Sequence, residues 1–190
     1  MIGQQRDLLT RFRQMLTAVG GECRQVENLA EAVQAIVTHE ALVEKEIVVP
    51  PHFASQQPWG LLLPLLSNQG ISIREAESPA SVADAPAGLS GADLAIAETG
   101  SVLLAENALE ARMVSMLSLT HFVLVRADDL VPMLDEAGAR LQQLTRSGPD
   151  QRRYISLVTG PSRTADIERT LSIGVQGPKA LCVLVVHHAE

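Results

Sequence analysis

The chain has 190 residues, of which 46% are hydrophobic and 19% charged, and this is the balance of a folded globular protein rather than of a disordered one. A formal net charge of −7 argues against binding to a nucleic-acid backbone. The apolar run at residues 181–186 is far shorter than the ~20 residues of a membrane helix, and the N-terminus lacks a hydrophobic signal segment. We therefore expect a single domain over residues 1–190, located in the cytoplasm.

Patterns of apolar residues predict helices and strands along the first half of the chain. Apolar side chains recur at helical spacing over residues 4–19, so an amphipathic helix that packs on a sheet is expected there. A capping-box pattern starts a second helix over residues 28–37, and β-branched residues at 46–49 predict a strand. Residues 51–70 are apolar but contain several prolines and glycines, which predicts an irregular segment before a short strand at 71–74.

Strands and helices also alternate in the second half. The predicted segments are a small helix and loop at 78–88, strands at 93–97 and 102–105, a helix at 109–118, a strand at 121–125, a helix at 128–144 and a strand at 154–158. The connection between residues 97 and 102 is too short for a helical crossover, so these two strands are expected to pair antiparallel. The whole pattern predicts a three-layer α/β/α fold with a mostly parallel sheet.

The most informative segment is Thr-Gly-Pro-Ser-Arg-Thr-Ala-Asp-Ile-Glu at residues 159–168. The preceding strand runs into Gly160, which permits turn geometries that other residues resist, and Ser162 or Thr164 would cap a following helix. A last buried strand is expected at residues 179–186. Turns between a strand and a helix are where α/β proteins bind small molecules.

The backbone amides at the start of this predicted helix could hold a carboxylate or a phosphate, because they are unpaired and the helix dipole adds a positive field. Arg163 could add a bidentate contact to such an anion. Alternatively, Asp166 and Glu168 satisfy the same amides without any ligand. The candidate ligand-binding residues of this turn are Gly160, Ser162, Arg163, Thr164, Asp166 and Glu168.

A second candidate site is the turn at residues 98–101, where an apolar strand is interrupted and then resumes. Glu98 could present its carboxylate to a cleft and act as a general base or a nucleophile. Alternatively, it is a surface turn residue or an ion-pair partner of Arg112 or Arg163. Both turns are expected to line one crevice at the ends of neighbouring strands. The other candidate ligand-binding residues of this turn, which also suit a turn for geometry alone, are Thr99, Gly100 and Ser101.

The two turns, followed by Gly174 and Gly177-Pro178, resemble the signature of the lactate utilization protein C family, the LUD domain. The resemblance covers nearly the whole chain and is concentrated in residues 91–186. It implies the fold shared by ribose-5-phosphate isomerase, glucosamine-6-phosphate deaminase and CoA transferases. It also implies a role in the oxidation of L-lactate to pyruvate, alongside iron–sulfur partner proteins.

The sequence shows no motif for a group that accepts the electrons of lactate oxidation. Cys23 and Cys182 are its two cysteines, and they lack the spacing of iron–sulfur ligands. Neither a dinucleotide fingerprint nor a Walker loop is present, and the histidines lack metal-ligand spacing, so no cofactor or metal is expected. The resemblance therefore implies a non-redox accessory subunit that binds a small carboxylate or phosphate, or that docks partners through the apolar segment 58–66.

A function of a different class stays open. The chain could be an independent enzyme that acts on a sugar phosphate or an acyl-CoA thioester, with Glu98 as base or nucleophile. Loss of turnover in a Glu98→Gln variant would indicate the independent enzyme, whereas activity that appears only in a reconstituted complex would indicate the accessory subunit. A fold shared with enzymes does not decide between them, because one fold hosts many functions.

Overall fold

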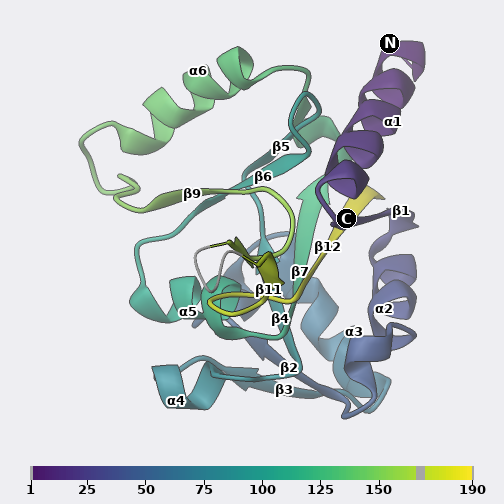
Figure 1. Ribbon diagram of the computed structural model, residues 1–190, viewed down its shortest axis with the longest axis vertical. Coiled ribbons are helices and arrows are strands. Elements are labelled where there is room, and N and C mark those ends of the chain that lie inside the picture. Colours follow the sequence, from purple (N-terminus) through teal and green to yellow (C-terminus); the bar gives the residue numbers. More distant parts are fainter. Residues whose placement is uncertain (1, 166–169, 190) are drawn as a thin grey trace.

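The computed structural model describes residues 2–165 and 170–189. Its centre is a six-stranded sheet in the order β1-β12-β7-β4-β2-β3, in which all neighbouring strands run parallel (Figure 1). The strands of this sheet are β1 (Glu22–Asn28), β2 (Glu46–Val49), β3 (Ser72–Glu75), β4 (Ala87–Gly91), β7 (Thr120–Arg126) and β12 (Ala180–His188). Strand β12 lies between β1 and β7, so a late segment of the chain occupies the interior of the sheet.

A smaller sheet of four strands lies beside the central one. Its order is β8-β5-β6-β9, built from β5 (Leu94–Ile96), β6 (Ser101–Ala105), β8 (Leu130–Val131) and β9 (Ile155–Val158). Strands β5 and β6 pair antiparallel, as their short connection predicts, but they do not belong to the central sheet. Apolar side chains cover both faces of the small sheet, one toward the central sheet and one toward helix α6 (Leu134–Thr145).

Helices flank the central sheet on both faces, which confirms the predicted α/β fold with a mostly parallel sheet. Helices α2 (Leu29–Val37) and α3 (Leu62–Asn68) pack against one face. The other face carries α1 (Ile2–Ala18), the small sheet, and the pair α4 (Pro79–Val82) and α5 (Leu109–Leu117) (Figure 1). The described residues also form four short 3₁₀ helices: η1 (Glu40–Leu42), η2 (Phe53–Ser55), η3 (Trp59–Leu61) and η4 (Ala127–Asp129). In the described ranges, 2–165 and 170–189, no helix combines the length and apolar character needed to cross a bilayer.

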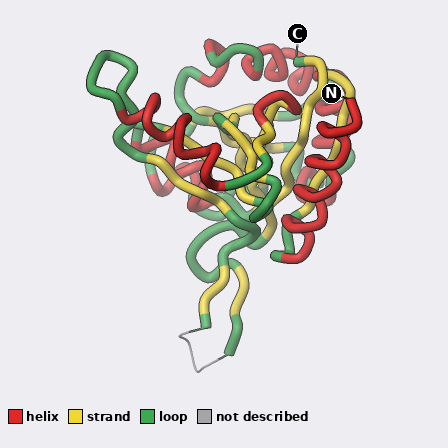
Figure 2. The backbone as a smooth tube through the Cα atoms, turned by 90° about the horizontal axis from the view of Figure 1, so that it is seen from above, coloured by secondary structure: helices red, strands yellow, loops and turns green. Residues whose placement is uncertain are grey.

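The helix predicted to follow Gly160 is wrong in the described part of that segment. Residues Arg163–Thr164 form strand β10, which pairs antiparallel with β11 (Ser172–Ile173) in an arm that projects from the body (Figure 2). The cause is tertiary pairing, because the Ser162 amide donates to the Pro178 carbonyl at 2.9 Å and the Ser162 carbonyl accepts from the Gly174 amide at 2.9 Å. The arm therefore has no helix N-terminus that could hold an anion at Ser162 or Thr164.

The predicted helix at 128–144 also needs correction, since it begins only at Leu134, after η4 and β8. The reason is again long-range pairing: the carbonyl of Val131 accepts from the Ala97 amide at 2.8 Å, which ties this segment to the edge of the small sheet. Asp166 and Glu168, two of the predicted ligand-binding residues, lie outside the described residues.

Candidate functional site

The structure brings the two signature turns together through a chain of hydroxyl groups. The Ser101 Oγ lies 2.7 Å from the Thr99 Oγ1 and 2.7 Å from the Thr159 Oγ1. These contacts form because β6, which starts at Ser101, pairs antiparallel with β9, which ends one residue before Thr159. The two turns thus meet at neighbouring strand ends, whereas a crevice lined by both turns stays a prediction.

Both turns also support the C-terminal end of α1. Gly100 has a φ of +69°, and a Cβ atom built on it would lie 2.3 Å from the backbone nitrogen of Leu16. Gly160 has a φ of +77°, and its Cβ would lie 2.6 Å from the carbonyl oxygen of Val19. Glycine is required at both positions because helix α1 approaches the backbone of each turn at contact distance.

Arg163 contacts the same end of helix α1. Its Nη2 donates a hydrogen bond to the carbonyl oxygen of Val19 at 2.5 Å. The neighbouring Ser162 points the other way and donates through Oγ to the Gln176 carbonyl at 2.6 Å. Arg163 therefore ties the arm to the end of α1.

Glu98 lies at the N-terminus of α6. Its Oε2 accepts a hydrogen bond from the Leu134 amide at 3.1 Å, and its own amide donates to the Pro132 carbonyl at 3.0 Å. The carboxylate thus meets one of the helix amides that lack a partner within the helix, and its charge is favourable at that end of the helix dipole. Among the described residues, Glu98 forms no ion pair with Arg112 or Arg163.

Replacing Glu98 by alanine is expected to lower the free energy of unfolding by about 1 kcal/mol, because a helix amide loses its acceptor. Urea unfolding of the purified variant measures this loss. The Glu98→Gln variant keeps a carbonyl oxygen and should lose less. A Glu98→Ala variant as stable as the parent would contradict a capping role.

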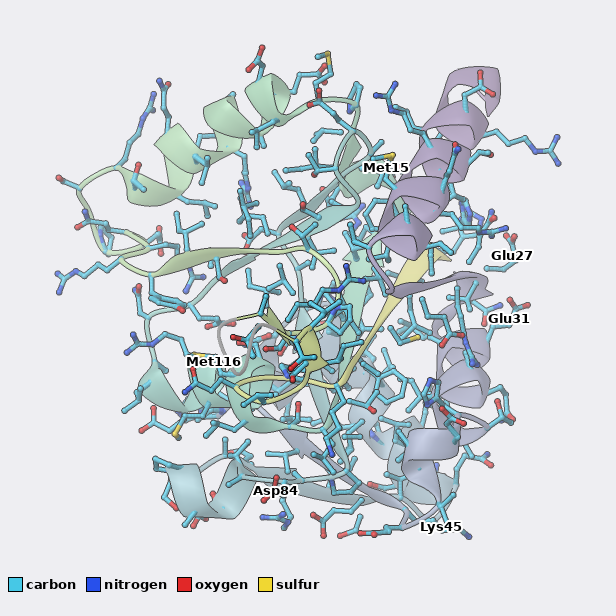
Figure 3. The ribbon with its side chains drawn as sticks, viewed as in Figure 1. Met15, Glu27, Glu31, Lys45, Asp84 and Met116 are labelled. Carbon is cyan, nitrogen blue, oxygen red and sulfur yellow. The ribbon has the colours of Figure 1, made fainter. Side chains whose placement is uncertain are left out.

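The largest cavity near the signature turns has a volume of about 900 Å³ and lies where the arm meets α5. We call it the signature pocket. It lies beside the amino ends of β4, β7 and β12. Figure 3 labels two of its residues, Met116 on α5 and Asp84 before β4. Of the predicted ligand-binding residues, Gly160 and Ser162 line it, whereas Glu98, the other residues of its turn, Arg163 and Thr164 do not. The full lining is Ala83, Asp84, Ser115–Leu119, Leu157–Ser162 and Gly174–Lys179.

A second cavity, which sequence reasoning missed, lies at the carboxyl ends of the central strands, opposite the signature pocket at their amino ends. It has a volume of about 430 Å³ and opens beside Gly91 and Arg126, the last residues of β4 and β7. We call it the arginine cleft. The sequence signal was the placement of charged residues directly after two buried parallel strands, where α/β proteins bind ligands. Its lining consists of Gln56–Trp59, Gly91–Asp93, Ala105, Glu106, Arg126, Asp129, Arg140 and Arg152.

One group of potential metal ligands occurs among the described residues: Glu22, His39 and Cys182 have donor atoms within 4.8 Å of one another. The His39 Nδ1 accepts the Ala41 amide at 3.1 Å, so the ring proton is on Nε2, which lies 3.2 Å from the Glu22 carboxylate. Burial raises the pKa of the Cys182 thiol to about 12. A metal ion would have to displace protons from both groups, so the contacts fit a hydrogen-bonded cluster better than a metal site.

A model of the LUD domain matches residues 9–186 of this chain. The chain belongs to the LUD domain family. In this LUD domain, Gly100 and Gly160 pack against the end of helix α1, and Gly160, Gly174 and Gly177 line the signature pocket.

Named relatives and a solved structure agree with this membership. Lactate utilization protein C of Bacillus licheniformis is 29% identical over 179 residues, which cover 86% of this chain and 75% of that protein. Proteins of the same name from Halalkalibacterium halodurans and Macrococcus caseolyticus are 34% and 36% identical, over alignments that cover 52% of this chain and only 43% of each relative. The crystal structure of a DUF162 family protein from Deinococcus radiodurans superposes with a TM-score of 0.71 at 25% identity and covers 96% of this chain and 98% of that one.

Proposed function

We propose that this LUD domain is a non-redox component of lactate utilization and that a partner protein docks at the signature pocket. The names of its relatives support the pathway. Two cysteines without cluster spacing support the need for an iron–sulfur partner, because L-lactate gives up two electrons when it becomes pyruvate. The observation that carries the proposal is that residues of both the arm and β9 near Gly160 line a cavity of about 900 Å³ and that apolar side chains surround its mouth.

The mouth of the pocket exposes large apolar side chains on three different segments. Met116 of α5 is 52% exposed, Leu157 of β9 is 44% exposed and Val175 before β12 is 49% exposed. Apolar side chains gathered around a cavity mark an interaction surface, and a pocket at its centre can receive an anchoring side chain of the partner. Lactate alone is far too small to fill a cavity of about 900 Å³.

The apolar segment at residues 58–66 is a weaker docking surface than its composition indicates. Trp59, Leu62 and Leu66 are buried in the core that α2 and α3 share. Leu61 and Leu65 remain exposed on this segment. The leucines there serve mainly to pack α3 against the sheet.

Co-purification with the iron–sulfur proteins of a lactate-oxidising system tests the proposal. We expect the unaltered chain to co-elute with a partner and the Leu157→Glu variant to lose it, because a charge at the pocket mouth stays unpaired on docking. The Leu61→Glu variant introduces the same charge on the segment at 58–66 and should keep the partner.

The opposite result, with loss only in Leu61→Glu, would move the docking site to residues 58–66. Failure of the unaltered chain to bind any of these proteins would reject the accessory role. Circular dichroism of each variant checks that the added charge has not unfolded the chain.

A further inference from the structure

The arginine cleft contains side chains that the proposed docking role does not use. Arginine side chains come from three elements: Arg126 ends β7, Arg140 lies on α6, and Arg152 precedes β9. Three carboxylates from other segments line the same cavity, namely Asp93, Glu106 and Asp129. Since these residues are far apart in the sequence, the fold gathers them.

The arginines of the cleft have poorly satisfied charges. Arg140 Nη2 lies 3.3 Å from Asp93 Oδ1, and Arg126 Nε lies 3.9 Å from Asp129 Oδ2. Arg74 Nη2, by contrast, lies 2.6 Å from Glu46 Oε1. Charge-assisted hydrogen bonds are usually about 2.7–2.9 Å long, so the contacts in the cleft are long ones. The other partners of these two arginines are also distant, with Arg140 Nη1 at 3.3 Å from Gln143 Oε1 and Arg126 Nη2 at 3.8 Å from Asp128 Oδ2.

Arg152 is the least engaged of the three arginines. Among the described residues its guanidinium makes no hydrogen bond or ion pair, and it acts on Asp93 and Glu106 only through longer-range attraction. The Glu106 carboxylate likewise makes no hydrogen bond within the part of the chain that the structure describes. The unpaired Arg152 guanidinium, which can donate two parallel hydrogen bonds, therefore lines the same cavity as the unpaired Glu106 carboxylate.

The charge balance of the cleft favours a singly charged anion. Three guanidinium groups and three carboxylates cancel when all are ionised. Burial raises the pKa of Asp93, of Glu106 and of Asp129, which favours uptake of a proton by this group of carboxylates. The cleft therefore has no large excess of positive charge, which suits a singly charged carboxylate better than a doubly charged phosphate.

We propose that the arginine cleft binds a small 2-hydroxycarboxylate, with its carboxylate on Arg152 and its hydroxyl group donating to Glu106. The planar guanidinium matches a carboxylate through two parallel hydrogen bonds. The buried ring of Trp59 gives the cavity an apolar wall for the ligand's carbon chain. The site lies at the carboxyl ends of parallel strands, outside the signature pocket, so it is separate from partner docking.

Thermal unfolding and calorimetry of the full chain with L-lactate, propionate and inorganic phosphate test this site. We expect L-lactate to raise the melting temperature and to bind at least about tenfold more tightly than propionate, which lacks the hydroxyl group. The Arg152→Gln variant should lose the shift. Arg153→Gln is the matched control, because Arg153 is the exposed neighbour that does not line the cleft.

A Glu106→Gln variant separates the two contacts, since an amide still accepts from the hydroxyl group and the proton-binding carboxylate is gone. It should keep binding L-lactate. If proton uptake by the cleft strengthens binding at lower pH, the variant should show a smaller increase than the parent, because Asp93 and Asp129 still titrate. Equal shifts in Arg152→Gln and in the parent, or equal affinities for L-lactate and propionate, would overturn the proposal. Preference for inorganic phosphate would overturn the ligand class. Leu157→Glu should leave L-lactate binding intact, so failure of docking and failure of this site give different results.

Discussion

Replacing Gly100 by alanine is expected to lower the free energy of unfolding by about 3 kcal/mol or more. The left-handed φ of +69° disfavours any side chain, and the new Cβ would meet the Leu16 nitrogen at 2.3 Å. Since that atom belongs to the backbone of α1, the helix itself must shift. Urea unfolding measures the loss, and the near-ultraviolet circular dichroism should report altered packing.

Gly70 offers a matched control for the steric part of this effect. Its φ of +77° is almost the same, but a Cβ there would meet nothing within 4 Å. The Gly70→Ala variant should therefore lose only the backbone contribution of about 1–2 kcal/mol. Equal losses at Gly70 and Gly100 would show that contact between the signature turn and α1 contributes nothing.

The protein is expected to lose stability as the pH falls from about 6.5 to 4, and His121 should account for up to about 3 kcal/mol of the loss. This side chain is fully buried, and burial lowers its pKa from 6.5 to about 4. Between these values the unfolded chain binds a proton that the folded chain does not, so acid favours unfolding. Above pH 6.5 both states are neutral at this position and the contribution is constant.

The His121→Gln variant isolates this contribution from the titration of carboxyl groups. His121 Nε2 lies 3.0 Å from the Ser90 Oγ, and a glutamine amide can reach the same hydroxyl without titrating. Denaturant unfolding of both proteins at a series of pH values gives the difference in slope. A parent and a variant with parallel pH profiles would show that His121 does not control acid stability.

Local patterns in the sequence were sufficient for the elements whose side chains decide their own structure. The β-branched run at 46–49 coincides with β2, and Asn28 caps α2, where its side chain accepts the Glu31 amide at 3.0 Å; the Glu31 carboxylate accepts from the Glu27 amide instead of completing the capping box. The buried apolar run at the end of the chain forms β12. Each of these segments has a periodicity that burial on one or both faces imposes.

Other elements depend on partners that are distant in the sequence. Strand β1 is mostly polar, with Val26 as its one buried residue, and its parallel pairing with β12, in which Glu22 aligns with Cys182, makes it a strand. The segment after Gly160 has helical spacing, but hydrogen bonds from Ser162 to residues near Gly174 and Pro178 turn it into a β arm. Tertiary pairing overrides local propensity at both positions.

The candidate site divides in the same way. The sequence identified the two signature turns, and the structure joins them through Ser101. In the structure, however, Glu98 caps the N-terminus of α6 and Arg163 binds the backbone at the end of α1. The arginine cleft combines side chains from six separate segments. The charged residues that follow two buried strands were a signal for a site there, but no spacing along the chain links the three arginines, so only the fold shows that they line one cavity.

The interior position of β12 has a consequence for how the protein is made. During translation, β7 and β1 leave the ribosome long before residues 180–188 exist, so each exposes an unsatisfied edge toward the vacant place between them. Pairings at this sequence separation form late and slowly. Nascent chains that stall before residue 180 should therefore bind strongly to chaperones that shield strand edges. Once β12 has left the ribosome and paired with β1 and β7, the chain should no longer need these chaperones.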